Sequence, residues 1–272
     1  MVYIVADIGG TKTRLASSRD LKTFEEPIIL DTPPKYTDGL SAIVQRAKDI
    51  AGGEAVEAVS LALSGVIIAD KKTTHKSNLS DWDGRAIGDD IGSALGAEAY
   101  LLNDTATVGI GESLFGAGRG AAIVVYMTVS TGVNAVRIVN GVPDHSVYGS
   151  ETGDQYMLID NKPEQLGNII SGTAVSRKYG IPPRELGKDS PVWEELARFT
   201  AFGLYNSIVH WSPERVVLGG SMFNEIGISV DRVAAHLATI NVKYPTLPEI
   251  VHSELGDLGG LWGGLARLKQ LT

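Results

Sequence analysis

The chain has 272 residues, of which 43% are hydrophobic, so it can form one large or two smaller packed domains and is not intrinsically disordered. Its 24 lysines and arginines against 32 aspartates and glutamates give a net charge of −8, which argues against a general binder of nucleic acid or of anionic membranes. The absence of cysteine excludes disulfides, thiolate zinc sites, iron–sulfur clusters and cysteine nucleophiles. Since the sequence shows neither a signal peptide nor a run of about 18 apolar residues, we expect a soluble cytoplasmic protein.

Strands and helices alternate in the first part of the chain. Continuous apolar runs predict strands at residues 2–6, 12–17, 56–63 and 99–102. Apolar residues at helical spacing predict helices at residues 38–51, 85–95 and 105–115. Glycine pairs mark the ends of several elements, such as Gly9-Gly10 after the first strand and Gly52-Gly53 after the first helix.

The second part of the chain continues the alternation. Strands are predicted at residues 121–127, 135–139 and 215–218, and helices at 165–179, 192–211, 231–240 and 258–271. The pair Asn140-Gly141 is typical of a hairpin turn. Because the two kinds of element interleave throughout, we expect an α/β fold.

One pattern of strand, small polar turn and strand occurs twice. It is found in VADIGGTKTRLA near the start and in YMTVSTGVNAVRIV from Tyr126. Alignment of the two segments places Asp7 on Thr128, Gly10 on Thr131 and Thr11 on Gly132. Two such halves predict two similar domains flanking a cleft, which is a favoured place for a ligand. The alternative is coincidence, since strand–turn–strand motifs are common.

Both turns have the composition of a phosphate-binding turn. Small residues let backbone N–H groups approach the phosphate oxygens, and threonine and serine hydroxyls add further donors. Neither turn is a Walker A loop, because the pattern GxxxxGK[ST] is absent. The segment GAGRGA at 116–121 matches the loose dinucleotide pattern, but it precedes a strand and opens no helix, so a Rossmann site is not indicated.

Three further residues have two interpretations each. Asp104 lies between an expected strand and an expected helix, where a carboxylate serves as a general base or as a helix N-cap. Glu151, in the loop YGSETGD, binds hydroxyl groups or is solvated, and Trp82 stacks on a sugar or closes the core, of which we favour the core. The five histidines form no HExxH motif and GxSxG is absent, so neither zinc hydrolysis nor a serine hydrolase is indicated.

Six motifs follow one another along the chain. They are DIGGTKT (7–13), SNLSDW (77–82), LLNDTATVGIGE (101–112), VSTGVN (129–134), GSETGD (149–154) and VVLGGSM (216–222). In this order they resemble the ROK family of bacterial sugar kinases and sugar-responsive repressors. The resemblance covers nearly the whole chain and implies two actin-like (ribonuclease H-like) domains, at residues 1–110 and 111–272, with a C-terminal helix near 259–271 packing back on the first.

The resemblance implies a kinase that uses ATP and Mg²⁺ to transfer a phosphoryl group to a sugar hydroxyl. Asp104 would be the general base, and Asp7 would orient Mg²⁺ through water. The implied nucleotide-binding residues are Gly9, Gly10, Thr11 and Lys12 in the first turn, Thr131 and Gly132 in the second, and Gly219 and Gly220 beside the adenine. The implied sugar-binding residues are Asn78, Asn103, Glu151 and Asp154.

The chain departs from the family pattern at the sugar clamp. Ser130 and Asn134 stand where the family's turn has more glycine, and Gly167 stands where a glutamate is expected. Asp154 replaces the histidine that binds zinc and sugar in the family, and the cysteine-rich zinc loop is missing. We therefore expect no structural zinc and an altered sugar specificity, with Glu151 and Asp154 accepting hydrogen bonds from hydroxyl or ammonium groups. The alternative is that Asp154 faces solvent.

Two functions follow from these residues. The retained Asp7, Asp104 and both turns favour an ATP-dependent kinase of a hexose or an amino sugar. The alternative is a catalytically idle sugar-sensing or regulatory protein on the same fold. A DNA-binding repressor is not expected, because the first turn follows directly on the start of the chain. The expected partners are ATP and a small sugar, without nucleic acid or membrane, and a homodimer is left open.

Overall fold

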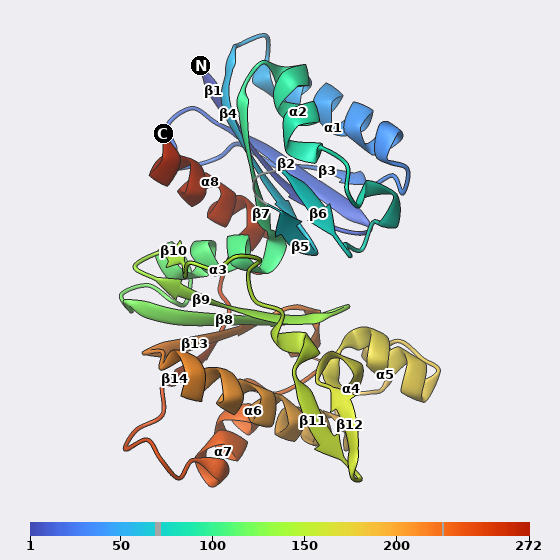
Figure 1. The fold of residues 1–272 in the computed structure, drawn as a ribbon, viewed down its shortest axis with the longest axis vertical. Coiled ribbons are helices and arrows are strands. Elements are labelled where there is room, and N and C mark those ends of the chain that lie inside the picture. The colour runs from blue at the N-terminus through green and yellow to red at the C-terminus, as the bar shows by residue number, and fades with distance from the viewer. Residues whose placement is uncertain (69–71, 225) are drawn as a thin grey trace. The chain divides into compact units, whose positions relative to one another are not determined.

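The computed structural model describes residues 1–68, 72–224 and 226–272, and the chain forms two compact units (Figure 1). Unit 1 comprises Met1–Leu114, His145–Gly149 and Asp257–Thr272, and unit 2 comprises Phe115–Asp144 and Ser150–Gly256. The domain boundary after residue 110 that the sequence suggests stays a prediction. Among the described residues, no helix is long and apolar enough to cross a membrane.

Unit 1 is built on a five-stranded sheet in the order β3-β2-β1-β4-β7. Its strands are β1 (Val2–Ile8), β2 (Lys12–Ser18), β3 (Ile28–Asp31), β4 (Val56–Leu63) and β7 (Glu98–Asn103). Strand β2 is antiparallel to both β1 and β3, whereas β4 and β7 continue the sheet in parallel with β1. The turn of residues 9–11 joins β1 to β2 and sets Asp7 opposite Arg14.

Helices cover both faces of this sheet. Helices α1 (Tyr36–Ala51) and α2 (Ile87–Leu95) share a core with Ile4 and Ile8 of β1, and α8 (Gly259–Leu271) shares another core with Val5. Alternate residues of β1 enter different cores because successive side chains of a strand point to opposite faces. Helix α3 (Asp104–Leu114) lies beside α8 (Figure 1).

Trp82 belongs to the core of unit 1. It is fully buried, and its ring meets Tyr36 edge-on with 5.3 Å between the ring centroids. The Cβ of any larger residue at Gly39 would lie 2.1 Å from Cζ2 of Trp82, so α1 accepts the indole because residue 39 is glycine. The preferred interpretation of Trp82 as a core residue is thus confirmed, and its ring is not available to stack on a sugar.

Unit 2 repeats the sheet of unit 1 in the order β10-β9-β8-β13-β14. Its strands are β8 (Ile123–Val129), β9 (Val133–Val139), β10 (Val142–Pro143), β13 (Arg215–Gly219) and β14 (Glu249–His252). The first three are antiparallel and the last two run parallel to β8, which is the arrangement of unit 1. Residues 130–132 form the turn that corresponds to residues 9–11, so the predicted internal repeat of strand, turn and strand is confirmed. The pairing differs by one residue, since Ile8 lies opposite Thr13 but Val129 lies opposite Val133.

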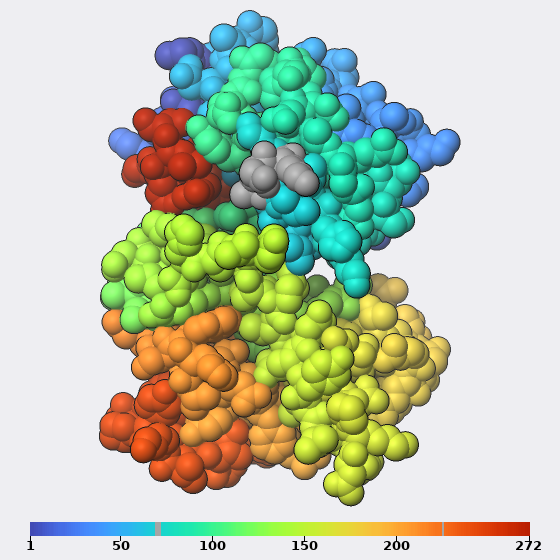
Figure 2. Space-filling model, viewed as in Figure 1, coloured from blue at the N-terminus to red at the C-terminus, as the bar shows by residue number. Residues whose placement is uncertain are grey.

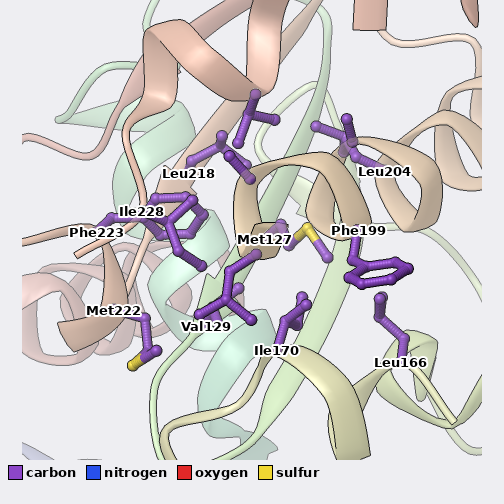
Figure 3. Packing of buried hydrophobic residues seen from close by; sticks show 14 of the residues in the cluster. Met127, Val129, Leu166, Ile170, Phe199, Leu204, Leu218, Met222, Phe223 and Ile228 are labelled. Carbon is purple, nitrogen blue, oxygen red and sulfur yellow. The ribbon is translucent and has the colours of Figure 1, made fainter. Parts of the chain in front are cut away.

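The helices of unit 2 enclose its largest core. They are α4 (Gly167–Ile170), α5 (Gly172–Tyr179), α6 (Val192–Trp211) and α7 (Val230–Ile240). In Figure 3, Met127 and Val129 of β8 point towards Ile170 of α4 and Phe199 of α6. Burial of such side chains contributes about 25 cal/mol per Å² of apolar surface, and this core holds β8 and the turn after it in place.

The helix predicted at 165–179 is present as two helices, α4 and α5, and Gln165 belongs instead to strand β12 (Lys162–Gln165). Ser171 separates the two helices, and its hydroxyl caps α5 by accepting a hydrogen bond from the Ala174 N–H. Apolar spacing alone did not reveal this interruption. Strand β11 (Tyr156–Ile159) pairs with β12 through a turn in which Asp160 and Asn161 both have positive φ.

Further strands were not predicted. These are β3, β5 (Val66–Ile68), β6 (Thr73–His75), β11, β12 and β14. Each has only three or four residues, too few to show a reliable period. The β11–β12 hairpin, yellow-green in Figure 2, lies on the surface of unit 2 with Tyr156 and Leu158 exposed.

Candidate active site

The first glycine-rich turn is fixed by backbone contacts within unit 1. The Gly9 N–H donates to the Lys12 carbonyl oxygen at 2.9 Å, which closes the turn between β1 and β2. A Cβ at Gly10 would lie 3.1 Å from Cβ of Asn78, so the absent side chain lets the exposed Asn78 come close to the turn. The structure thereby brings the predicted phosphate turn next to a predicted sugar ligand.

Asp7, near the end of β1, has a carboxylate whose pKa is shifted by burial and by neighbouring charges. Its side chain is partly exposed, yet no hydrogen-bond donor from the described residues reaches its carboxylate. Burial and the negative charge of Asp104 raise the pKa of Asp7 to about 6, and Asp257 acts in the same direction. Arg14 opposes the shift, but its guanidinium is engaged by Asp257 at 2.7 Å. A carboxylate without donors favours a cation or water beside it.

Asp104 is the first residue of α3, and its neighbour Asn103 caps the helix. Asn103 Oδ1 accepts from the Ala106 N–H at 3.1 Å, which is the bond that an N-cap makes with the third helical residue. Asp104 Oδ1 accepts from the Thr105 N–H at 2.7 Å. Burial raises the pKa of the partly exposed Asp104 carboxyl, and the hydrogen bonds from Thr105 only partly offset this. The N-cap of α3 is therefore Asn103, and Asp104 occupies the first helical position.

Two predicted ligands of unit 1 are occupied by contacts within the protein. Asn103 Nδ2 donates to the Gly65 carbonyl oxygen at 3.0 Å, so this amide holds the end of β7 to the β4–β5 loop. Lys12 Nζ pairs with Asp31 across β2 and β3 at 2.5 Å. Both partners of that pair are more than half exposed, so the pair contributes little to stability.

The second turn lies at the corresponding place in unit 2. The Ser130 N–H donates to the Gly132 carbonyl oxygen, and Thr131 and Gly132 are exposed. Gly220, directly after β13, has φ +95°, and a Cβ there would lie 2.5 Å from the Val129 carbonyl oxygen at the end of β8. Glycine is thus required at position 220 both by conformation and by the closeness of β8.

The predicted sugar loop forms a short helical turn in unit 2. The turn η3 (Thr152–Asp154) follows Glu151, and both Glu151 and Asp154 are exposed. Gly167, where the family resemblance leads to a glutamate, lies against this turn, because a Cβ there would be 3.3 Å from the Gly153 carbonyl oxygen. The structure thus brings these three positions together within one unit.

Sequence reasoning missed one residue of the candidate site, Gly260 of α8. A Cβ at this position would lie 2.6 Å from Cγ of Asp7 and 2.7 Å from Oδ2. Helix α8 therefore packs directly against the Asp7 carboxylate and limits its movement. No motif in the sequence marks this contact, which exists because residues 7 and 260 meet in the folded unit.

We expect the substitution Gly260→Ala to lower turnover about 100-fold, because displacement of a reacting group by about 1 Å costs that much. The new methyl group would clash with the Asp7 carboxylate and move it. Steady-state kinetics measure the loss. The matched control is Gly264→Ala on the same helix, where the nearest atom is Ser60 Oγ at 3.2 Å. Equal activity of the two variants would contradict the role of Gly260.

The candidate site fits Mg²⁺ bound through water better than a metal held directly by the protein. Among the described residues, no group of three or more histidine, aspartate or glutamate side chains is arranged to hold a metal ion. Asp7 nevertheless offers a carboxylate without a hydrogen-bond donor from those residues, next to a turn in which Gly10 and Thr11 are exposed. These features suit a hydrated cation that arrives with a nucleotide.

Comparison with known proteins decides the family. The model of the ROK family matches residues 3–270. The chain belongs to the ROK family. A fructokinase of Zymomonas mobilis subsp. mobilis is 26% identical to this ROK chain over 289 residues, covering 97% of this chain and 95% of the relative.

Solved ROK structures share the fold. A ROK family glucokinase from Streptomyces griseus in complex with glucose and AMPPNP has a TM-score of 0.80 at 22% identity, with 99% of this chain and 100% of that chain covered. A ROK family transcriptional regulator, a homologue of the E. coli MLC protein, has a TM-score of 0.81 at 16% identity, with 99% and 78% covered. The expected α/β fold with two actin-like domains is confirmed by the first likeness. Because the ROK family includes kinases and regulators, the function needs a separate argument.

Proposed function

We propose that this ROK protein is an ATP-dependent kinase that transfers the γ-phosphoryl group to a hydroxyl of a hexose or an amino sugar. The observation that carries the proposal is the pair of carboxylates, Asp7 and Asp104, in unit 1. Both are partly exposed, both have raised pKa values, and the charge of one raises the pKa of the other. Paired carboxylates with perturbed pKa values next to a glycine-rich turn are typical of catalytic sites.

Asp104 would act as the general base. As the sugar hydroxyl attacks the γ-phosphorus, its proton passes to the Asp104 carboxylate, the bond from the γ-phosphorus to the bridging oxygen breaks, and ADP leaves. Burial raises the pKa of Asp104 and so strengthens it as a proton acceptor. The bond from the Thr105 N–H to Oδ1 keeps the carboxylate in one orientation during the transfer.

Mg²⁺, when bound with ATP, would neutralise charge on the phosphate oxygens. Asp7 would orient the water shell of the ion, and its missing donors and raised pKa support this role. The exposed Gly10 and Thr11 would donate N–H groups to phosphate, while the Gly9 N–H stays bonded to the Lys12 carbonyl oxygen, and Lys12 would leave Asp31 to bind the phosphate.

Unit 2 carries candidate nucleotide and sugar contacts of its own. Thr131 and Gly132 are exposed at the second turn, and the partly exposed Gly220 directly after β13 would lie beside an adenine. Gly219, the last residue of β13, is buried, and a Cβ there would lie 2.8 Å from the Tyr126 hydroxyl oxygen.

The exposed carboxylates of Glu151 and Asp154 would accept hydrogen bonds from sugar hydroxyl or ammonium groups. In unit 1 the exposed Asn78 is the candidate sugar ligand, because both ends of the Asn103 amide are bound within the protein.

The second candidate is a sugar-sensing protein without turnover. The altered clamp supports it, since Asp154 and Gly167 replace residues of the family pattern and Asn103 is already bound to Gly65. The retained carboxylate pair supports the kinase, because binding alone needs no general base. We therefore favour the kinase.

The proposal is tested by incubating the protein with ATP, Mg²⁺ and single sugars. Glucose, fructose, N-acetylglucosamine, N-acetylgalactosamine and N-acetylmannosamine form the panel, and mass spectrometry detects the sugar phosphate. We expect one of these sugars to be converted to its sugar phosphate, and we expect excess chelator to stop the reaction. Formation of no sugar phosphate from any member, with tight sugar binding, would favour the sensing protein instead.

We expect purified protein to contain far less than one zinc per chain by elemental analysis. The chain has no cysteine, so the three thiolate ligands of the family's zinc site are lacking, and Asp154 stands in place of the fourth ligand. Zinc at one equivalent, retained after dialysis, would contradict this expectation.

We expect Asp154→Ala to raise the KM for the accepted sugar, because the substitution removes a carboxylate that would accept a hydrogen bond from the sugar. An unchanged KM would mean that the Asp154 side chain faces solvent and does not contact the sugar.

A further inference from the structure

The turn that carries Glu151 is tied to strand β9 at three points within unit 2. The Ser150 hydroxyl donates to the Ala135 carbonyl oxygen. The Thr152 N–H donates to Asn134 Oδ1 at 3.1 Å. Gly153 packs so closely that a Cβ there would lie 2.1 Å from the Val133 carbonyl oxygen. The backbone on both sides of Glu151 is therefore fixed by the first residues of β9.

Asn134 is the one side chain of β9 among these contacts, and it is buried, with 8% of its surface exposed. Its Oδ1 also accepts from the Ala135 N–H at 2.8 Å and lies 3.5 Å from the Thr152 hydroxyl. These donors fix the orientation of the amide, because the opposite orientation would place an NH₂ group against N–H groups.

The NH₂ group of the Asn134 amide makes no hydrogen bond to the described residues. Asn134 Nδ2 has no acceptor among the described residues, although the side chain is more than nine-tenths buried. The Nδ2 atom itself is not among the fully buried, unpartnered side-chain atoms of the described residues, so it keeps some contact with solvent. A buried amide that leaves two N–H donors unpaired costs free energy unless water or a ligand accepts them.

We propose that Asn134 is a specificity-determining residue for the acceptor sugar. Its Oδ1 positions the Glu151 turn, and its Nδ2 donates a hydrogen bond to an oxygen of the bound sugar. The inference rests on the proposed function and deepens it. It adds a donor to a site whose other predicted groups in unit 2, Glu151 and Asp154, are acceptors, so the site takes sugars that offer both hydroxyl donors and an oxygen acceptor.

Two substitutions separate the two roles of Asn134. Asn134→Gly removes the acceptor and the donor, whereas Asn134→Asp keeps an oxygen for the Thr152 N–H and loses the NH₂ group. The matched control is Asn140→Gly at the other end of β9, where the side chain is exposed and the positive φ of 51° suits glycine.

The readouts are amide hydrogen exchange at Thr152 and the kinetic constants for the sugar and for ATP. In Asn134→Gly we expect faster exchange at Thr152 and a rise of the sugar KM by about 10-fold or more, which corresponds to the loss of one or two hydrogen bonds. In Asn134→Asp we expect unchanged exchange and a raised sugar KM. In both variants and in the control the KM for ATP stays within about 2-fold of the wild-type value.

Two results would overturn the inference. An unchanged sugar KM in Asn134→Gly would contradict both the positioning of the Glu151 turn and the hydrogen bond to the sugar. A raised sugar KM with unchanged hydrogen exchange at Thr152 in that variant would contradict the positioning role. Failure of the proposed function is distinguishable from these outcomes. If the wild-type protein phosphorylates none of the panel sugars, sugar affinity measured by calorimetry takes the place of KM, and the same comparison of wild type with Asn134→Gly and Asn134→Asp decides.

Discussion

Replacement of Asp104 by asparagine is expected to lower kcat for sugar phosphorylation by about 10²–10⁴, the usual loss on removal of a general base. Asparagine has nearly the shape of aspartate and keeps an oxygen for the Thr105 N–H, so the start of α3 should survive. It cannot take up the proton of the attacking hydroxyl. The KM for ATP should change little, because Asp104 has no place in the nucleotide contacts.

Thermal unfolding distinguishes this role from a structural one. Burial raises the pKa of Asp104, so its ionised form is disfavoured in the folded state and the neutral asparagine should not lower Tm. The matched control is Asp231→Asn, an exposed aspartate in the first turn of α7. Unchanged kcat in Asp104→Asn would remove Asp104 as the base, and a large loss of Tm with unchanged kcat would make it a structural residue.

Replacement of Asp7 by asparagine is expected to stop phosphorylation and to stabilise the protein without ligand. The pKa of Asp7 is raised from 3.8 to about 6, so folding favours the protonated form. The stability that this group gives is complete below about pH 4 and is lost as the pH rises through about 6. Above that pH the folded wild-type protein holds an unfavourable charge that asparagine lacks.

The size of this effect follows from the pKa. A shift of about two units corresponds to about 2–3 kcal/mol, which is an upper limit because the carboxylate is partly exposed. We expect the Tm of Asp7→Asn to exceed the wild-type value by a few degrees, about 2–4 °C per kcal/mol, at pH 8 and by much less at pH 4.5. A lower Tm at pH 8, or an equal difference at both pH values, would contradict the burial of this charge.

The role of Asp7 also predicts how Mg²⁺ affects binding and turnover. Wild-type turnover should require Mg²⁺, and the wild-type protein should bind Mg²⁺ with ATP more tightly than Asp7→Asn does, as calorimetry measures. The ion favours the ionised Asp7 and offsets the repulsion from Asp104 and Asp257. Full activity in excess chelator would contradict the role of Asp7.

Much of the fold could be predicted because local signals agreed with tertiary structure. The turns after β1 and β8 combine small residues with flanking apolar strands, and their likeness predicted two units of the same topology. Helix α6 was predicted with its observed ends, since it is long and periodic. The short strands were missed because three or four residues pair only in the context of a sheet, as β14 does beside β13.

The site was predictable only where its residues form local motifs. The turn of Gly9 to Thr11 and the pair Asn103-Asp104 are continuous in sequence and were found. The contact of Gly260 with Asp7 and that of Asn134 with Thr152 join distant residues or act through a side chain at an ordinary strand position. No sequence pattern encodes them, and they appear only when packing distances and hydrogen bonds are known.

Transfer of the terminal phosphate of ATP to sugar tests the central claim most directly. The protein is incubated with γ-³²P-labelled ATP, Mg²⁺ and the sugar that binds most tightly. Labelled sugar phosphate is counted, and the unlabelled ADP is measured by chromatography of the same sample. The account predicts that both products form in equal amounts over many turnovers, and that Asp104→Asn forms neither at a comparable rate. Tight sugar binding with all label remaining in ATP would contradict the account and establish a sensing protein on this fold.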